Sequence, residues 1–139
     1  MFERRSAKTL IAIMALCWLN ACSNARPAAG LDAPRLHHVA VVWLKAAGDE
    51  ALRRQYVEAS LSLAHLPGIV SYSAGTPAEV RRSRANAAVD ESYDVAISAV
   101  FENSEAYQAF LQHPDYVKLA QQVLRPLVDR YKVYDFAAP

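Results

Sequence analysis

The sequence predicts a single α+β domain whose strands and helices follow one another in the order β-α-β-β-α-β. Its 139 residues leave room for one domain, and a hydrophobic content of 53% is enough to build a core. Short β-branched runs alternate with helical patterns that capping residues, proline and glycine delimit. A net charge of +1 gives no indication of nucleic-acid binding.

The N-terminus reads as a targeting segment. Basic residues precede an apolar run at 10–19, which has the length of a signal-peptide core and is too short to span a bilayer. The run ends in Leu19-Asn20-Ala21-Cys22, which resembles the lipobox of bacterial lipoproteins. That resemblance implies a signal peptide at 1–21, cleavage before Cys22 and lipid on the Cys22 sulfur. Ordinary secretion, with Cys22 incidental, is the alternative.

A lipid anchor would place the protein on a membrane of the bacterial cell envelope. Several acyl chains on one terminus hold a protein on a membrane stably. Ser23 stands where an inner-membrane retention signal has Asp, so by analogy we expect the outer membrane, facing the periplasm. Residues 22–35 lack periodicity and contain Pro27, Gly30 and Pro34, which predicts a flexible tether.

The first strand is expected over His38–Leu44, where apolar residues occupy both alternating faces. Both faces of such a strand need cover. Helices can cover one face, and a second copy of the chain is the economical cover for the other.

A helix is expected to begin after Asp49, a good N-cap, and to run to about Ala64 along one apolar stripe. Leu66-Pro67-Gly68 ends it, and Ile69–Ala74 forms the second strand. The polar segment 78–92 contains Arg81-Arg82-Ser83-Arg84. We expect a solvated loop there, with a contact to phosphate or lipid headgroups as the alternative.

The third strand is expected over Tyr93–Phe101, followed by a short helix that Asn103 or Ser104 caps and that extends to Leu111. His113-Pro114 breaks the helix, because proline disfavours helical geometry in the residue before it. A further helix over about Asp115–Leu124 and a fourth strand over Arg130–Phe136 complete the order. This is the ferredoxin-like arrangement, a four-stranded antiparallel sheet with helices on one face.

Three features together resemble the stress-responsive dimeric α/β-barrel (Dabb) family over residues 36–137. They are His38 opening the first strand, Leu66-Pro67-Gly68 before the second, and His113-Pro114 after Phe101. The resemblance implies a homodimeric α/β barrel, in which the bare sheet faces of two copies pack together. It also implies that His38 faces the helices and a pocket, while Val39, Val41 and Trp43 face the partner.

Catalytic members of that family, such as those that cyclise a polyketide, have a histidine two residues after the proline and a tyrosine about a turn and a half earlier. Those positions are Tyr116 and Phe110 here. A phenol with a pKa near 10 is a poor general base at neutral pH, and phenylalanine has no proton to exchange. The chain therefore lacks that dyad, and we lean against an enzyme.

Candidate ligand-pocket residues are drawn from the strands and from the helix break: His38, Tyr72, Phe110, His113, Tyr116 and Asp135. His38 alternatively ends a strand as a hydrogen-bonded histidine, His113 caps the preceding helix, and Tyr116 packs in the core. No cluster has the spacing of a metal site and no glycine-rich phosphate loop is visible, so we expect no metal and no cofactor. Haem binding, known in related dimeric barrels, stays an open alternative.

The sequence thus predicts a membrane-anchored homodimer, non-catalytic or binding a small apolar ligand, with a role in stress or in the cell envelope. The alternative is an enzyme of cyclase, lyase or monooxygenase type that acts on an apolar carbonyl or aromatic substrate. In that case His38 is the base and Tyr116 the hydrogen-bond donor.

Overall fold

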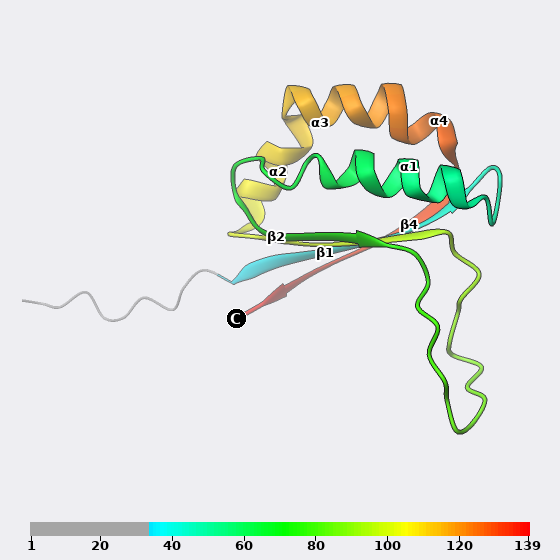
Figure 1. Ribbon diagram of the computed structural model, residues 1–139. Helices are drawn as coiled ribbons and strands as arrows, with labels where there is room; N and C mark the ends of the chain where they lie inside the picture. Colours follow the sequence, from blue (N-terminus) through cyan, green and yellow to red (C-terminus); the bar gives the residue numbers. More distant parts are fainter. Residues whose placement is uncertain (1–33) are drawn as a thin grey trace, which may run out of the picture.

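The computed structural model describes residues 34–139, which form one sheet with a layer of helices on one face (Figure 1). The expected signal peptide at 1–21, the lipidation site Cys22 and the tether up to residue 33 lie outside the described residues. Within residues 34–139, no helix combines the length and the apolar character needed to cross a membrane.

The sheet has four strands: β1 (Arg35–Leu44), β2 (Ile69–Gly75), β3 (Val95–Phe101) and β4 (Val128–Ala138). Their order across the sheet is β2-β3-β1-β4, and every neighbouring pair is antiparallel. This confirms the expected ferredoxin-like sheet. The register sets His38 of β1 between Ala99 of β3 and Asp135 of β4.

Strands β1 and β4 are both longer than expected. β1 begins three residues before His38, inside the segment predicted as tether, and β4 extends beyond Arg130–Phe136 at both ends. Pairing runs from Arg35 opposite Ala138 to Leu44 opposite Val128. The cross-strand hydrogen bonds extend both strands over residues such as Arg35 and Ala138, whose own strand propensity is low.

The helical layer begins with α1 (Glu50–Leu61), which ends three residues earlier than expected, and α2 (Ser104–Gln112). The side chains of Asp49 and Asn103 accept hydrogen bonds from the amides of Leu52 and Ala106, so each acts as an N-cap.

The break at His113-Pro114 separates α2 from α3 (Pro114–Leu119). Nδ1 of His113 accepts a hydrogen bond from the Asp115 amide at 3.3 Å. The ring therefore caps the following helix, where we had expected it to cap the carbonyls of the preceding one. Proline explains the geometry, because it fits the first turn of a helix and holds His113 in an extended conformation.

The last helical segment continues past the expected end at Leu124. A π-helical turn, η1 (Ala120–Leu124), follows α3, and the short α4 (Arg125–Leu127) follows that turn. Pro126 accounts for the wide turn, because in a regular α-helix its ring would meet the carbonyl four residues earlier. The amide of Arg125 instead bonds the carbonyl of Ala120, five residues back.

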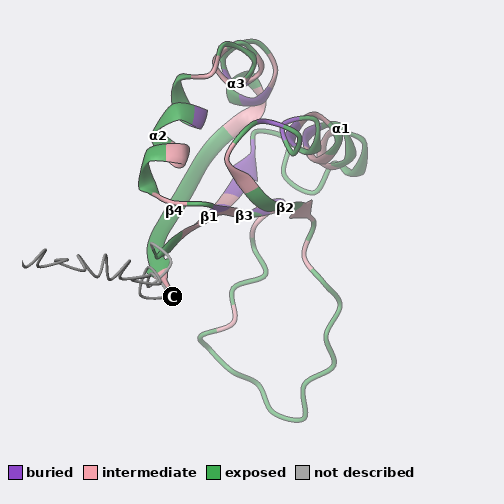
Figure 2. Ribbon diagram, turned by 90° about the vertical axis from the view of Figure 1, so that its left-hand side faces the viewer, coloured by how far each residue is buried: buried purple, intermediate pink, exposed green. Residues whose placement is uncertain are grey.

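The core lies between the sheet and the helices. Alternate residues of β3 face it, and Phe101 and Val95 are fully buried there. Figure 2 shows that the buried residues gather where the helices meet the sheet, whereas β4 is exposed along most of its length. None of the helices within residues 34–139 lies on the opposite sheet face, which is called the helix-free face below (Figure 1).

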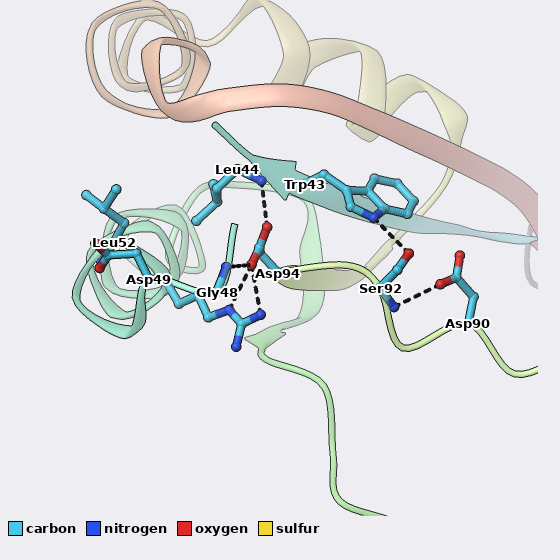
Figure 3. Close-up of polar contacts among 9 residues, drawn as sticks. Trp43, Leu44, Gly48, Asp49, Leu52, Asp90, Ser92 and Asp94 are labelled. Atoms are coloured by element: carbon cyan, nitrogen blue, oxygen red, sulfur yellow. Dashed lines mark hydrogen bonds and ion pairs between the residues drawn. The ribbon is translucent and has the colours of Figure 1, made fainter. Parts of the chain in front are cut away.

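The long connection between β2 and β3, residues 76–94, extends from the sheet on the side away from the helices (Figure 1). Its return to the sheet is fixed by Asp94, whose carboxylate accepts hydrogen bonds from the amides of Leu44 and Gly48, each at 2.8 Å (Figure 3). Arg53 of α1 adds an ion pair at 2.8 Å. Asp94 therefore ties the ends of β1 and β3 to the first helix.

Candidate functional site

A cavity of about 280 Å³ lies between the sheet and the helical layer. That volume is larger than the roughly 150 Å³ of a dry cavity known to hold benzene. Most of its walls are aliphatic or aromatic, and all four strands and every helix contribute side chains. The polar groups are a histidine, five tyrosines and an arginine: His38, Tyr56, Tyr72, Tyr107, Tyr116, Tyr131 and Arg125.

His38 is held in the cavity wall by two polar neighbours. Its Nδ1 lies 2.7 Å from Oδ1 of Asp135, the residue opposite it on β4, and 3.0 Å from the hydroxyl of Tyr107 on α2. An ionised carboxylate can only accept, so Nδ1 carries the proton and donates it. In that tautomer Nε2 is the acceptor nitrogen. A histidine oriented in this way can accept a hydrogen bond, or a proton, from a molecule in the cavity.

Four tyrosines of the cavity have raised pKa values: Tyr56, Tyr72, Tyr107 and Tyr116. Burial raises the pKa of Tyr107 to about 12, and the negative charge of Asp135 acts in the same direction. Burial likewise raises the pKa of Tyr56 to about 12, with neighbouring tyrosines adding to the effect. The pKa values of Tyr72 and Tyr116 are also raised, mainly by burial. These phenols can donate hydrogen bonds to a ligand but cannot act as bases.

Four of the candidate pocket residues line this one cavity: His38, Tyr72, Phe110 and Tyr116. The ring centroids of Phe110 and Tyr116 lie 4.7 Å apart, so these two side chains form one aromatic wall. Asp135 does not line the cavity itself, but it contacts His38, which does. His113 does not line it, because its ring is turned to the start of α3.

The residues expected at a dimer interface lie on the helix-free sheet face. Val39 and Val41 are half-buried there. Trp43 is only 7% exposed, since its ring is already covered within the chain. Its Nε1 donates to Ser92 at 3.1 Å, and the Arg130 guanidinium lies 4.5 Å from the ring centroid. Trp43 thus has little surface left for a partner.

Sequence reasoning missed four polar residues of the cavity: Tyr56, Tyr107, Arg125 and Tyr131. Tyr107 precedes Phe110 by three residues, the spacing that places two side chains on one helix face. Tyr131 lies an even number of residues before Asp135, the spacing that places two side chains on one sheet face. Those two could have been found by periodicity. Arg125 could not, because the π-helical turn before it interrupts the regular helical periodicity.

Residues 34–139 contain no group of three or more histidine, cysteine, aspartate or glutamate side chains arranged to hold a metal ion. Asp135 is the only acidic residue in contact with His38 in that part of the chain. The side chains of the cavity supply hydrogen bonding, proton transfer at His38 and contact with aromatic surfaces.

Comparison with known proteins identifies the fold. The family model described as Stress responsive A/B Barrel Domain (Dabb) matches residues 36–138. A Dabb family protein of ferredoxin-like fold from Mesorhizobium loti has a TM-score of 0.59 and 21% identity, over 74% of this chain and 95% of that one. No curated protein gives a significant match.

Two further solved structures share this fold. A dimeric ferredoxin-like protein of unknown function from Thermobifida fusca has a TM-score of 0.59 and 19% identity, over 76% of this chain and 92% of that one. Hydroxynitrile lyase from Passiflora edulis has a TM-score of 0.61 and 14% identity, over 76% of this chain and 94% of that one. At these identities the likeness shows the fold alone.

Proposed function

Because the chain belongs to the stress-responsive A/B barrel (Dabb) family, we propose that it forms a homodimer that binds a small, largely apolar molecule in the cavity beside His38. The cavity is the main evidence for this proposal. It is large enough for more than one aromatic ring, its walls are mostly apolar, and a few polar groups converge on it, which is typical of small-molecule sites. A role in stress or in the cell envelope fits this binding function.

The helix-free sheet face supports the dimer. Val39 and Val41 lie there beside two exposed aromatic residues of β4, Tyr134 and Phe136, which are 55% and 52% exposed. An apolar sheet face of this kind favours association with another surface. The Thermobifida fusca protein of the same fold is dimeric, and we extend that assembly to this chain.

The N-terminal sequence supports an anchor on a membrane of the bacterial envelope, which we propose to be the outer membrane facing the periplasm. This proposal is based on the motif that ends in Cys22. Lipid on the cysteine sulfur would hold the domain at the membrane. Radiolabelled palmitate should enter the wild-type protein and not the Cys22→Ser variant. Equal labelling of the two proteins would contradict the anchor.

The binding proposal is tested with 2-naphthol, a two-ring aromatic whose hydroxyl can donate to Nε2 of His38. Calorimetry should show binding to the wild type and about tenfold weaker binding to His38→Ala, the value of one lost hydrogen bond. His65→Ala is the matched control, because His65 lies outside this cavity. Equal affinities of the wild type and His38→Ala for 2-naphthol would show that His38 does not contribute to binding.

A second candidate function is proton-transfer catalysis on an apolar carbonyl or aromatic substrate. The contact between His38 and Asp135 favours it, because the carboxylate fixes the tautomer that leaves Nε2 free to act as a base. Tyr116 would donate a hydrogen bond to the substrate oxygen. The hydroxynitrile lyase from Passiflora edulis is an enzyme of the same fold.

This second function predicts that the protein accelerates exchange of the α-protons of an aryl ketone such as acetophenone in D₂O, measured by NMR. His38→Ala should abolish the acceleration and Tyr116→Phe should reduce it, while His65→Ala should leave it unchanged. A rate that is the same in the wild type, His38→Ala and Tyr116→Phe would eliminate this assignment.

A further inference from the structure

The polar groups of the cavity lie at its two ends. Tyr107 of α2 meets His38 at one end, whereas Arg125 begins α4, and Figure 1 shows α2 and α4 at opposite ends of the helical layer. Tyr131 lies opposite Val42 on the neighbouring strand, four residues along β1 from His38. At about 3.4 Å per residue, the two ends are separated by about 14 Å along the sheet.

Arg125 is the one side chain of permanent charge among the described residues that line the cavity, and no carboxylate lines it. Within residues 34–139, no aspartate or glutamate lies within 4.0 Å of its guanidinium. Lys45 adds positive charge near this end, because its Nζ donates to the carbonyl of Pro126 at 2.9 Å. The Arg125 end of the cavity is therefore electropositive and lacks a counter-charge.

Tyr56 shows that this end has an unfilled hydrogen-bonding site. The residue is only 5% exposed, yet no group of residues 34–139 hydrogen-bonds its hydroxyl. By contrast, the hydroxyls of Tyr72 and Tyr107 bond Ser60 and His38. Every fully buried polar side-chain atom of residues 34–139 has a hydrogen-bond partner. Because the Tyr56 hydroxyl has none, it is not fully buried, and it opens into the cavity that Tyr56 lines.

Tyr131 lies at the same end of the cavity as Tyr56. Tyr56 packs with Val42 and Leu124 in one core cluster, and Tyr131 lies opposite Val42 on the neighbouring strand. Tyr116, by contrast, packs against Phe110 in the cluster nearer His38. Two phenolic hydroxyls and the Arg125 guanidinium therefore lie at the same end of the cavity.

We propose that the ligand of this cavity is a carboxylate, with its anionic group bound by Arg125 and the hydroxyls of Tyr56 and Tyr131 and its apolar body directed toward His38. This proposal rests on the proposed binding function and narrows its ligand class. A guanidinium only donates and a phenolic hydroxyl can donate, which suits a group that only accepts. The single charge of Arg125 in the wall matches the single charge of a carboxylate, and its planar fork matches the two oxygens.

The test compares 2-naphthoate with 2-naphthamide, which has nearly the same shape and no charge at pH 7. Calorimetry on the full chain should show naphthoate binding at least tenfold more tightly than naphthamide. In Arg125→Gln the two affinities should become equal through loss of naphthoate binding. Tyr56→Phe should weaken naphthoate several-fold and leave naphthamide nearly unchanged.

Arg84→Gln is the charge-matched control, because Arg84 lies in the exposed loop between β2 and β3, and it should keep the preference for naphthoate. Equal binding of the two probes to the wild type overturns the carboxylate proposal while the binding function stands. A preference that persists in Arg125→Gln also overturns it. If neither probe binds, the proposed binding function fails together with it.

Discussion

At the scale of single residues, Asp94 shows how the fold uses a buried charge. The residue is 1% exposed, and its two oxygens accept hydrogen bonds from Leu44, Gly48 and Arg53. Burial by itself would raise the pKa of the Asp94 carboxyl. The two backbone amides and the Arg53 guanidinium outweigh burial and hold that pKa below its usual range.

We predict that Asp94→Asn lowers the free energy of unfolding by about 3 kcal/mol at pH 7, because an amide nitrogen faces donors where an oxygen accepted from them. The folded-state pKa of Asp94 lies below the unfolded value of about 3.9, so its contribution is complete above that pH and is lost as the pH falls through the folded-state pKa. Urea unfolding between pH 7 and pH 3 should show the difference between wild type and variant shrinking in acid.

Asp129→Asn is the control for this experiment, because Asp129 is exposed and the described part of the chain gives it no ion-pair partner. It should change stability by less than about 0.5 kcal/mol. A difference between the wild type and Asp94→Asn that stays constant down to pH 3 would show that the carboxylate charge is not what stabilises the fold.

At the scale of secondary-structure elements, the approach of α2 to the start of β2 depends on a glycine. Gly68 has a φ of 82°, and a Cβ at this position would lie 2.7 Å from the Cβ of Ala106 on α2. Gly48 has a similar φ of 77°, but a Cβ there would meet no atom within 4 Å. The two glycines share the same backbone strain and differ only in this contact.

Gly68→Ala should therefore destabilise the protein by about 3 kcal/mol, from backbone strain and the contact with Ala106 together. Gly48→Ala should cost about 1 kcal/mol from strain alone. Urea midpoints of the two variants measure the difference. Equal losses in the two variants would mean that α2 moves freely away from Gly68.

The π-helical turn is the element that gives the cavity its second polar end. Pro126 follows Arg125 directly, and the wide turn before it sets where Arg125 stands in the cavity wall. The same helical segment supplies Tyr116 and Leu124 to the walls. A regular α-helix that ended at Leu124 would have placed Arg125 in the following loop.

At the scale of the whole molecule, the sheet has two unlike faces. One face holds the core and the cavity, whereas the other carries Val39, Val41 and the aromatic residues of β4 without a helix to cover them. The proposed dimer covers this second face, and dimerisation would leave the cavity on the outer side of each sheet.

Val39→Lys should convert the dimer to a monomer, because it places a charge in the middle of the helix-free face. Size-exclusion chromatography with light scattering, in a Cys22→Ser background, measures the mass. Leu61→Lys is the control, since Leu61 is 40% exposed on α1, and it should leave the dimer intact. A monomeric parent protein would contradict the proposed assembly.

The element order and the sheet with helices on one face follow from the amino-acid sequence alone. Alternation in β1 and β3, the caps at Asp49 and Asn103 and the break at Pro114 are local signals, and local physics decides them. The sequence also predicted that His38, Tyr72, Phe110 and Tyr116 line one pocket. The folded structure was needed to place Tyr107 beside His38, to turn His113 away from the cavity and to bring Arg125 into the cavity wall. Those contacts join residues distant in the chain or follow an irregular helical turn, so no local pattern encodes them.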